Sequence, residues 1–329
     1  MACTKLLVLY TGGTIGMQQS AEGLAPAAGF EARMRAQQAL EQGRDLPEWT
    51  FRELLPPIDS ANMSQANWLA MVAAIRAGVE QDGCDAVLVL HGTDTLAYSA
   101  GALSFLLLGL DLPVLLTGSM KPAGADGSDA WDNLFGAMAA LQRGVAPGVH
   151  LYFDGKLLHG ARVSKLASAS LGAFAELPRL RRSARAASLP TALDYRQPRQ
   201  PVSLAVLPFY PGIQAAQVEA LLASGVRGLL LECYGSGTGP SDDAGLLAAL
   251  EAAHEQGVVL AAISQCLQGH VEFGVYAAGS QLAASGLVSG GGMTREAALG
   301  KLFALLGAGL AQAEVEHWFA LDLCGERAD

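Results

Sequence analysis

Two short motifs in the sequence place threonine hydroxyls directly after an apolar run. The motif TGGT occupies residues 11–14, and the motif HGTDT occupies residues 91–95. A threonine hydroxyl is a weak nucleophile until a base takes its proton, so such a site needs a carboxylate or an amine beside it. Asp94 offers the carboxylate, and Lys165 offers an amine that becomes a base when it is desolvated or held near another charge. These residues predict nucleophilic catalysis by a hydroxyl group.

Each of these residues also has a purely structural explanation. The TGGT motif can be a tight turn between a strand and a helix, and Thr93, Asp94 and Thr95 can cap the helix that follows them. Lys165 can be a solvated side chain, and His91 can be a hydrogen-bonded core residue at the end of a buried strand. The repetition favours chemistry, because the carboxyl ends of neighbouring parallel strands meet in one crevice.

Other reaction classes lack their sequence signatures. A dinucleotide-binding fingerprint requires a glycine at position 11, where threonine stands, and no phosphate-binding GK[ST] motif follows. The sequence has no GxSxG nucleophile motif, and His254 lacks the second histidine of a zinc protease. The six histidines do not cluster in the sequence. The sequence therefore shows no signature of a metal site or of a nucleotide cofactor.

The elements that must position these residues follow from short apolar runs that alternate with segments of helical periodicity. This is the pattern of an α/β fold with a parallel sheet covered by helices on both faces. Asp154 and Gly155 predict a hairpin turn, and Ser128 with Asp129 predicts a helix cap. Candidate strands span 6–10, 86–91, 114–117 and 149–153, and candidate helices span 64–79, 98–108 and 130–142.

A change of composition separates two predicted domains. Arginines and prolines between Pro178 and Pro201 show little apolar periodicity, which indicates a connecting segment with solvated charges rather than an anion site. We expect an N-terminal catalytic α/β domain at 1–190, a linker at 191–201 and a smaller C-terminal α/β domain at 202–329. The arginines of this segment are Arg179, Arg181, Arg182, Arg185, Arg196 and Arg199. Beyond it, candidate strands span 202–207, 228–233 and 258–263, and candidate helices span 242–256 and 294–306.

Composition and charge limit the kinds of partner that the protein can bind and indicate the cellular compartment in which it works. The 329 residues carry 21 basic and 31 acidic side chains, a net charge of −10 that repels nucleic acid and anionic membranes. The five cysteines are scattered without C-x-x-C spacing, which indicates a reducing compartment rather than a disulfide framework. Asp111 and Pro113 interrupt the apolar stretch 103–116, and the N-terminus lacks the features of a signal peptide. We expect a cytoplasmic protein.

At its motifs the sequence resembles the bacterial L-asparaginase family, and within it the cytoplasmic type I branch. The resemblance extends over nearly the whole chain. It implies a larger N-terminal flavodoxin-like domain with a smaller C-terminal α/β domain, no cofactor, and a tetramer built from tight dimers. Its motifs are YTGGTIG at 10–16, DS at 59–60, HGTDTLAY at 91–98, TGS at 117–119, Lys165, YPGI at 210–213 and SQC at 264–266.

The resemblance also implies a role for each site residue. Thr14 is the nucleophile that attacks the side-chain amide of L-asparagine, releasing ammonia and leaving an acyl-enzyme for water to hydrolyse. Thr93, Lys165 and Asp94 are the hydroxyl, base and carboxylate that activate the attacking group or water, and the division of labour between the two threonines stays open. A free ammonium favours a carboxylate, and a free carboxylate favours hydroxyls and backbone N–H groups. The implied substrate-binding residues are Asp59, Ser60, Thr93, Asp94 and Ser119.

Three positions depart from the family pattern. Leu24 stands where relatives commonly carry a tyrosine on the mobile loop over the nucleophile, and Thr238 stands where many have an asparagine. Glu232 replaces a basic residue near the effector pocket, for which the candidates are Ser164, Glu232 and Cys266. Allosteric activation by asparagine is therefore not expected.

The sequence leaves two other functions open. One methylene in a pocket is worth only about 1–3 kcal/mol of discrimination, so a glutaminase or a glutaminase-asparaginase of mixed specificity is the alternative among enzymes. A catalytically weak amino-acid-binding sensor is the alternative from another class, and Leu24 and Thr238 motivate it.

Overall fold

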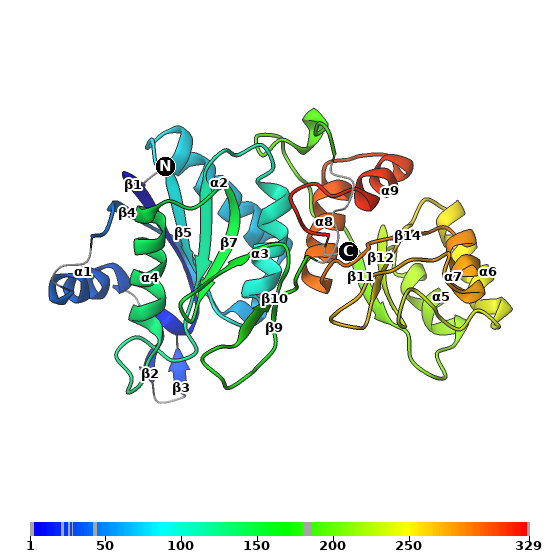
Figure 1. The fold of residues 1–329 in the computed structure, drawn as a ribbon, viewed down its shortest axis with the longest axis horizontal. Helices are drawn as coiled ribbons and strands as arrows, with labels where there is room; N and C mark the ends of the chain where they lie inside the picture. Colours follow the sequence, from blue (N-terminus) through cyan, green and yellow to red (C-terminus); the bar gives the residue numbers. More distant parts are fainter. Residues whose placement is uncertain are drawn as a thin grey trace. The chain divides into compact units, whose positions relative to one another are not determined.

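The computed structural model describes residues 3–20, 23–25, 27, 29–41, 45–179 and 186–327. Three arginines of the expected connecting segment, Arg181, Arg182 and Arg185, lie outside these residues. The chain divides into two compact units, Met1–Glu176 and Leu177–Asp329, and most of their helices and strands are labelled in Figure 1. The domain limits at 1–190, 191–201 and 202–329 stay a prediction. Within the predicted linker, Thr191–Leu193 forms a short 3-10 helix, η3.

A mostly parallel sheet forms the centre of the first unit. Its order over the described residues is β4-β1-β5-β6-β7-β8, and only the pairing of β7 with β8 is antiparallel. Asp154 and Gly155 both have positive φ between β7 and β8, which confirms the predicted hairpin turn. The strands are β1 (Lys5–Gly12), β4 (Glu48–Ile58), β5 (Ala86–Leu90), β6 (Pro113–Thr117), β7 (Gly148–Phe153) and β8 (Lys156–His159).

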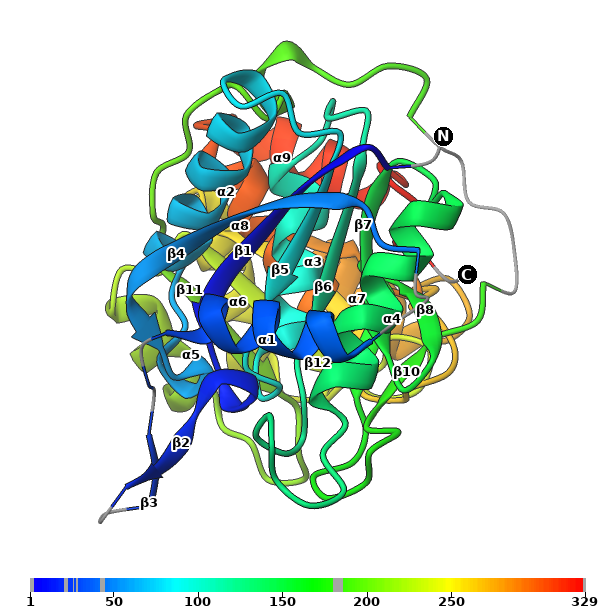
Figure 2. The same cartoon turned by 90° about the vertical axis from the view of Figure 1, so that its left-hand side faces the viewer.

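Helices cover both faces of this sheet, as the alternating pattern predicts. Figure 2 shows α1 (Phe30–Leu40) lying near α4 (Ala130–Arg143), and both contribute to the core that contains Val8 and Leu88. The alternate residues of β1 point to the opposite face, where Leu7 contacts Gly78 of α2 (Gln65–Glu80). On that face α3 (Leu96–Leu106) packs on β6 and β7.

Several short elements were not predicted. β2 (Gln18–Ser20) pairs with β3 (Gly23–Ala25), and β9 (Val163–Lys165) pairs with β10 (Phe174–Glu176), each pair antiparallel. Two 3-10 helices, η1 (Thr14–Gly16) and η2 (Ser60–Asn62), follow β1 and β4 directly. Both short helices begin at residues that the sequence singled out for chemistry.

The second unit has its own parallel sheet, with the order β11-β12-β13-β14 over the described residues. Leu229 and Leu231 face a core shared with α5, α6 and α7, while α8 and α9 pack on the other face. The strands are β11 (Leu204–Pro208), β12 (Gly228–Cys233), β13 (Val259–Ser264) and β14 (Leu287–Ser289). The helices are α5 (Ala215–Ala223), α6 (Ala244–Glu255), α7 (Ala277–Ala284), α8 (Arg295–Gly307) and α9 (Gln312–Ala320).

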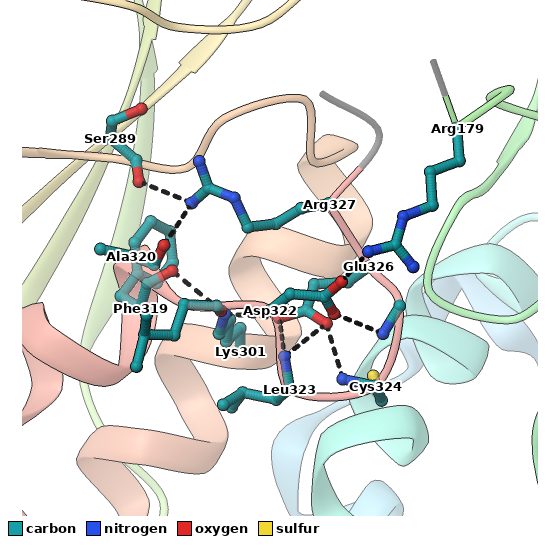
Figure 3. Close-up of polar contacts among 12 residues, drawn as sticks. Arg179, Ser289, Lys301, Phe319, Ala320, Asp322, Leu323, Cys324, Glu326 and Arg327 are labelled. Carbon is teal, nitrogen blue, oxygen red and sulfur yellow. Dashed lines mark hydrogen bonds and ion pairs between the residues drawn. The ribbon is translucent and has the colours of Figure 1, made fainter. Parts of the chain in front are cut away.

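A cluster of buried charged side chains joins the segment after α9, which contains Asp322 and Glu326, to the rest of the second unit (Figure 3). Lys301 of α8 donates to Glu326 and to the carbonyl of Phe319, while Arg179 pairs with Asp322. Burial raises the pKa of Asp322, and the Glu326 carboxylate raises it further. Burial acts in the same direction on Glu326, but the Lys301 ammonium and several hydrogen bonds outweigh it and lower the pKa of Glu326 to about 2. The sequence motifs gave no indication of this cluster.

Candidate active site

The predicted motifs lie at one edge of the first sheet. β4, β1, β5 and β6 are neighbours and run parallel, so their carboxyl ends face the same side. Asp59 and Ser60 follow β4, Thr14 follows β1, Thr93 follows β5, and Ser119 follows β6. The sheet order therefore gathers residues that are far apart in the sequence, as expected for the carboxyl edge of a parallel sheet.

Glycines allow the loops at this edge to touch. Gly13 has φ of 85°, and a Cβ there would overlap the backbone of Gly92. A Cβ on Gly92 would lie 2.5 Å from the Ser60 hydroxyl, and one on Gly118 would overlap the carbonyl of His91. The four loops are therefore in close contact, and the backbone of Gly13 packs against that of Gly92, which brings the segments carrying Thr14 and Thr93 together.

Thr14 begins η1 and is half-buried. The turn around it is fixed by the Gly13 N–H, which donates to the Ile58 carbonyl at 3.1 Å, and by the Ile15 carbonyl, which accepts from Ala123 N–H at 3.2 Å. The other hydroxyl of the TGGT motif is occupied, because Thr11 Oγ1 donates to the Leu90 carbonyl at 2.9 Å. Of the two threonines in this motif, Thr11 therefore has its hydroxyl bonded to the backbone, and Thr14 stays the predicted nucleophile.

Lys165 joins the second motif from β9. Its Nζ lies 3.0 Å from Thr93 Oγ1 and 2.8 Å from Asp94 Oδ1. The Lys165 side chain is 18% exposed and that of Asp94 is 66% exposed, so the lysine side chain is largely buried while the carboxylate borders solvent. The explanation of Lys165 as a solvated side chain is wrong.

The helix-cap explanation of the second motif is also wrong. Thr95 is the residue before α3, yet its side chain makes no capping hydrogen bond to that helix. Its hydroxyl donates instead to the Ser60 carbonyl at 2.8 Å. Thr95 thus ties the loop after β5 to the loop after β4.

His91 is a hydrogen-bonded core residue, as predicted. It is fully buried, with Nδ1 at 2.7 Å from the Gly92 carbonyl and Nε2 at 2.8 Å from Ser99 Oγ. The Trp68 indole N–H donates to the same Ser99 oxygen at 2.9 Å. These contacts fit a neutral ring that donates from Nδ1 and accepts at Nε2, and burial lowers the pKa of His91 to about 4. The ring holds the Gly92 carbonyl, next to Thr93.

The remaining substrate-binding candidates are already bonded in part. The Asp59 carboxylate is exposed and accepts from Ala61 N–H at 3.2 Å, while Ser60 is buried. Ser119 is buried, and its hydroxyl donates to the Lys121 carbonyl at 2.5 Å. Asp59 thus has the solvent-facing charge that an ammonium group would need.

Asp129 and Asn133 hold the loop that contains Ser119. The Asp129 carboxylate accepts from the backbone N–H of Met120 at 2.9 Å, and the Asn133 amide donates to the Gly118 carbonyl at 3.0 Å. The sequence predicts that Ser128 and Asp129 cap α4. The Ser128 hydroxyl accepts from Ala130 N–H at 3.1 Å, but the Asp129 side chain makes no capping hydrogen bond, so the prediction is wrong for Asp129. The sequence placed Asp129 near a helix start but gave no signal for its contact with the loop.

The three effector candidates are distributed over both units. Ser164 is buried in β9 of the first unit, whereas Glu232 and Cys266 belong to the second. The buried Glu232 carboxylate pairs with Arg295, whose Nη2 lies 2.7 Å from Oε2. Cys266 is exposed and its backbone N–H donates to Ser264 Oγ. The effector pocket stays a prediction.

The other departures from the family pattern have clear local surroundings. Leu24 lies in β3, pairs with Gln19 and is 48% exposed. Thr238 Oγ1 donates to the Tyr234 carbonyl at 3.3 Å within a tight turn. Among the described residues, no hydrogen-bond partner is found for the Thr14 hydroxyl.

The described residues contain no group of three or more His, Cys, Asp or Glu side chains placed to hold a metal ion. In the same part of the chain, no helix combines the length and the apolar character needed to cross a membrane.

The protein consists of two α/β units and gathers threonines, a lysine and a carboxylate at the edge of its first parallel sheet. Comparison with known protein families identifies the class of protein that has these features. Residues 5–190 match the family described as asparaginase, N-terminal, and residues 203–319 match the glutaminase/asparaginase C-terminal domain. The chain belongs to the asparaginase family.

Individual relatives agree with this assignment. The chain is 36% identical to L-asparaginase 1 of Escherichia coli strain K12, over 98% of this chain and 97% of that protein. It is 35% identical to a 60 kDa lysophospholipase of Mus musculus, over 98% of this chain but 62% of that protein. The crystal structure of L-asparaginase I from Vibrio cholerae superimposes with a TM-score of 0.84 at 34% identity, covering 99% of each chain. The predicted fold class and the predicted family are therefore confirmed.

Proposed function

We propose that the protein hydrolyses the side-chain amide of L-asparagine to L-aspartate and ammonia. The observation that carries this proposal is the contact of Lys165 Nζ with both Thr93 Oγ1 and Asp94 Oδ1, at the sheet edge where the loop of Thr14 packs against Gly92. An amine that contacts both a hydroxyl and a carboxylate supplies groups that nucleophilic acyl transfer requires. Membership of the asparaginase family supports the choice of substrate.

In the proposed mechanism Thr14 Oγ1 attacks the side-chain carbonyl carbon of asparagine and loses its proton to a base. The C–N bond then breaks, ammonia leaves with the added proton, and an ester joins Thr14 to the aspartyl group. Water attacks that ester, releases aspartate and returns the proton to Thr14. Lys165, which contacts Thr93 and Asp94, is the proposed group that accepts and returns protons in these steps.

Asp59 and Asp94 are the proposed partners of the substrate ammonium, because both carboxylates border solvent at the site. Ser60 and Ser119, with nearby backbone N–H groups, are the proposed partners of the substrate carboxylate. The backbone N–H groups around Gly13 and Thr93 are candidate donors to the oxyanion that forms on the amide oxygen.

The test is ammonia release by the purified protein with L-asparagine and L-glutamine side by side, over a wide concentration range. We expect rapid turnover of asparagine, and Thr14→Ala and Thr93→Ala each to lower kcat by at least about 10³-fold with the fold intact. Near-wild-type turnover by both variants would refute the mechanism. The comparison of the two amides decides whether the enzyme is an asparaginase or one of mixed specificity.

A catalytically weak amino-acid sensor is the second candidate. It is favoured by one observation, the lack of a hydrogen-bond partner for the Thr14 hydroxyl among the described residues, together with the apolar Leu24 in β3. Binding of asparagine without ammonia release would establish the sensor.

We further propose a cytoplasmic homo-oligomer, a dimer or tetramer. All five cysteines, which the structure describes, are free thiols, and this supports a reducing compartment. Light scattering coupled to size-exclusion chromatography measures the assembly, and a monomeric mass at assay concentration would contradict it.

A further inference from the structure

Arg33 of α1 contacts the turn that carries Thr14. Its Nη2 donates to the Gly16 carbonyl at 2.6 Å. Residues 17–29 separate η1 from α1 in the chain, so this bond joins the end of η1 to the helix that begins after it. We propose that Arg33 is a positioning residue for the nucleophile Thr14; this inference rests on the function proposed above.

The backbone of η1 explains why this bond matters. The carbonyls of Gly13 and Thr14 are used within the turn, because they accept from the N–H groups of Gly16 and Met17. The next two carbonyls lie at the end of the helix and have no partner within it. Ala123 N–H serves the carbonyl of Ile15, and Arg33 serves that of Gly16. The orientation of η1 is thus set from two sides.

An aromatic stack fixes the Arg33 guanidinium. Its Cζ lies 5.1 Å from the centre of the Phe30 ring. Phe30 in turn stacks on Tyr10 of β1 at 5.0 Å and on Trp131 of α4 at 5.8 Å. Tyr10 and Phe30 are buried in the first unit's core and Trp131 packs against it, so the ring that the guanidinium contacts is itself held in place.

The Tyr10 ring packs directly against the same turn. A Cβ on Gly16 would overlap the Tyr10 hydroxyl, so the ring and the turn are in direct contact. Gly16 is buried, and a carbonyl there that lost its partner would remain shielded from water. Removal of the Arg33 bond therefore favours a shift of η1, and Thr14 shifts with it.

The experiment compares Arg33→Met, Arg33→Gln and Arg33→Lys with Arg35→Met. Arg35 is a matched control on the same helix, since its side chain is 55% exposed and pairs with Glu31 at 2.8 Å. The readouts are kcat and KM for asparagine, the Kd of the unreactive product aspartate by calorimetry, and the thermal unfolding midpoint. Aspartate separates substrate binding from placement of the nucleophile.

We expect Arg33→Met to lower kcat by about 10- to 100-fold, because a displacement of about 1 Å costs this much, while KM and the aspartate Kd change by less than about 3-fold. Arg33→Lys should retain an intermediate kcat, because it keeps one charged donor. Arg35→Met should match the wild type in kcat, KM and the aspartate Kd. If Arg33→Met does not fold, the same loss of kcat is tested with Arg33→Gln, which shortens the side chain and removes its charge.

Three outcomes would overturn the inference: an unchanged kcat in the Arg33 variants, an equal loss in Arg35→Met, or aspartate affinity lost in parallel with kcat. Absence of asparagine turnover in the wild type would instead refute the proposed function. The two failures are therefore distinguishable.

Discussion

The Lys301 ammonium lies 2.5 Å from the Glu326 carboxylate, and neither side chain is exposed to solvent. Both charges have further partners, since Lys301 donates to the Phe319 carbonyl and Glu326 accepts from the backbone N–H groups of Leu323 and Cys324. A buried pair of this kind is costly to break from one side, because the charge that remains has no compensation.

Lys301→Met should therefore lower the free energy of unfolding by about 3–5 kcal/mol, the cost typical of an orphaned buried charge. Lys301→Met combined with Glu326→Gln should recover part of this loss, because glutamine removes the charge yet still accepts from the backbone. Urea unfolding measures both. Lys156→Met, whose side chain is 61% exposed, is the control and should cost no more than about 0.5 kcal/mol; an equal cost in the two single variants would contradict the prediction.

The stability of the fold should depend on His91 at mildly acidic pH. Burial lowers its pKa to about 4 in the folded protein, from an ordinary value of 6.5. Between pH 6.5 and pH 4 this histidine is protonated in the unfolded chain but neutral in the folded protein. The contribution of the neutral His91 to the free energy of unfolding is therefore complete above pH 6.5 and is lost as the pH falls towards 4.

The comparison is with His91→Asn, whose amide can still donate to the Gly92 carbonyl but does not titrate. The difference in unfolding free energy between wild type and variant should shift against the wild type as the pH falls through this range. A constant difference would show that His91 is protonated in the folded state as readily as in the unfolded state.

Lys165→Met should lower kcat by about 10²- to 10⁴-fold, the range typical for loss of a general base, with aspartate binding largely retained. Lys156→Met again serves as the control for removal of a lysine from the first unit. Loss of binding together with turnover, in a folded variant, would assign Lys165 to substrate binding instead.

Gly92→Ala tests the packing of the loops. The φ of Gly92 is not positive, so the expected effect comes from space alone: the new Cβ would lie 2.5 Å from the Ser60 hydroxyl and 3.2 Å from Gly13 Cα. We expect a loss of about 1–3 kcal/mol in stability and of at least about 10-fold in kcat. Gly274→Ala, whose Cβ meets no atom within 4 Å, should leave both unchanged; equal effects would show that the loops are not tightly packed.

Burial explains why the sequence predicted β5 and missed β4. β5 is buried along its whole length, so its residues are all apolar and the run is easily recognised. β4 is an edge strand that includes Glu48, Glu53 and two prolines, and half-buried or exposed residues dominate it. Its pairing with β1 depends on tertiary contacts that no local pattern reports.

The same distinction applies to the site. The motifs around Thr14 and Thr93 could be found because parallel strands present their ends together. The contact of Lys165 with Thr93 joins residues 72 positions apart through the short β9, so the residues alone left Lys165 ambiguous and the family resemblance selected it. Arg33 had no signal at all, because its contact with Gly16 exists only once α1 has packed on Tyr10 through Phe30.

The position of Glu326 in the chain has a consequence for biosynthesis. When the ribosome adds Lys301 to the chain, the acidic partner of this lysine is still missing, because Glu326 is added 25 residues later. The first unit has all its strands by then and can fold while the ribosome is still at work, as N-terminal domains generally do. The second unit can form the Lys301–Glu326 pair only after residue 326 has been synthesised, so a nascent chain that stops before Glu326 would expose an unpaired lysine in an unfinished second unit to chaperones and proteases.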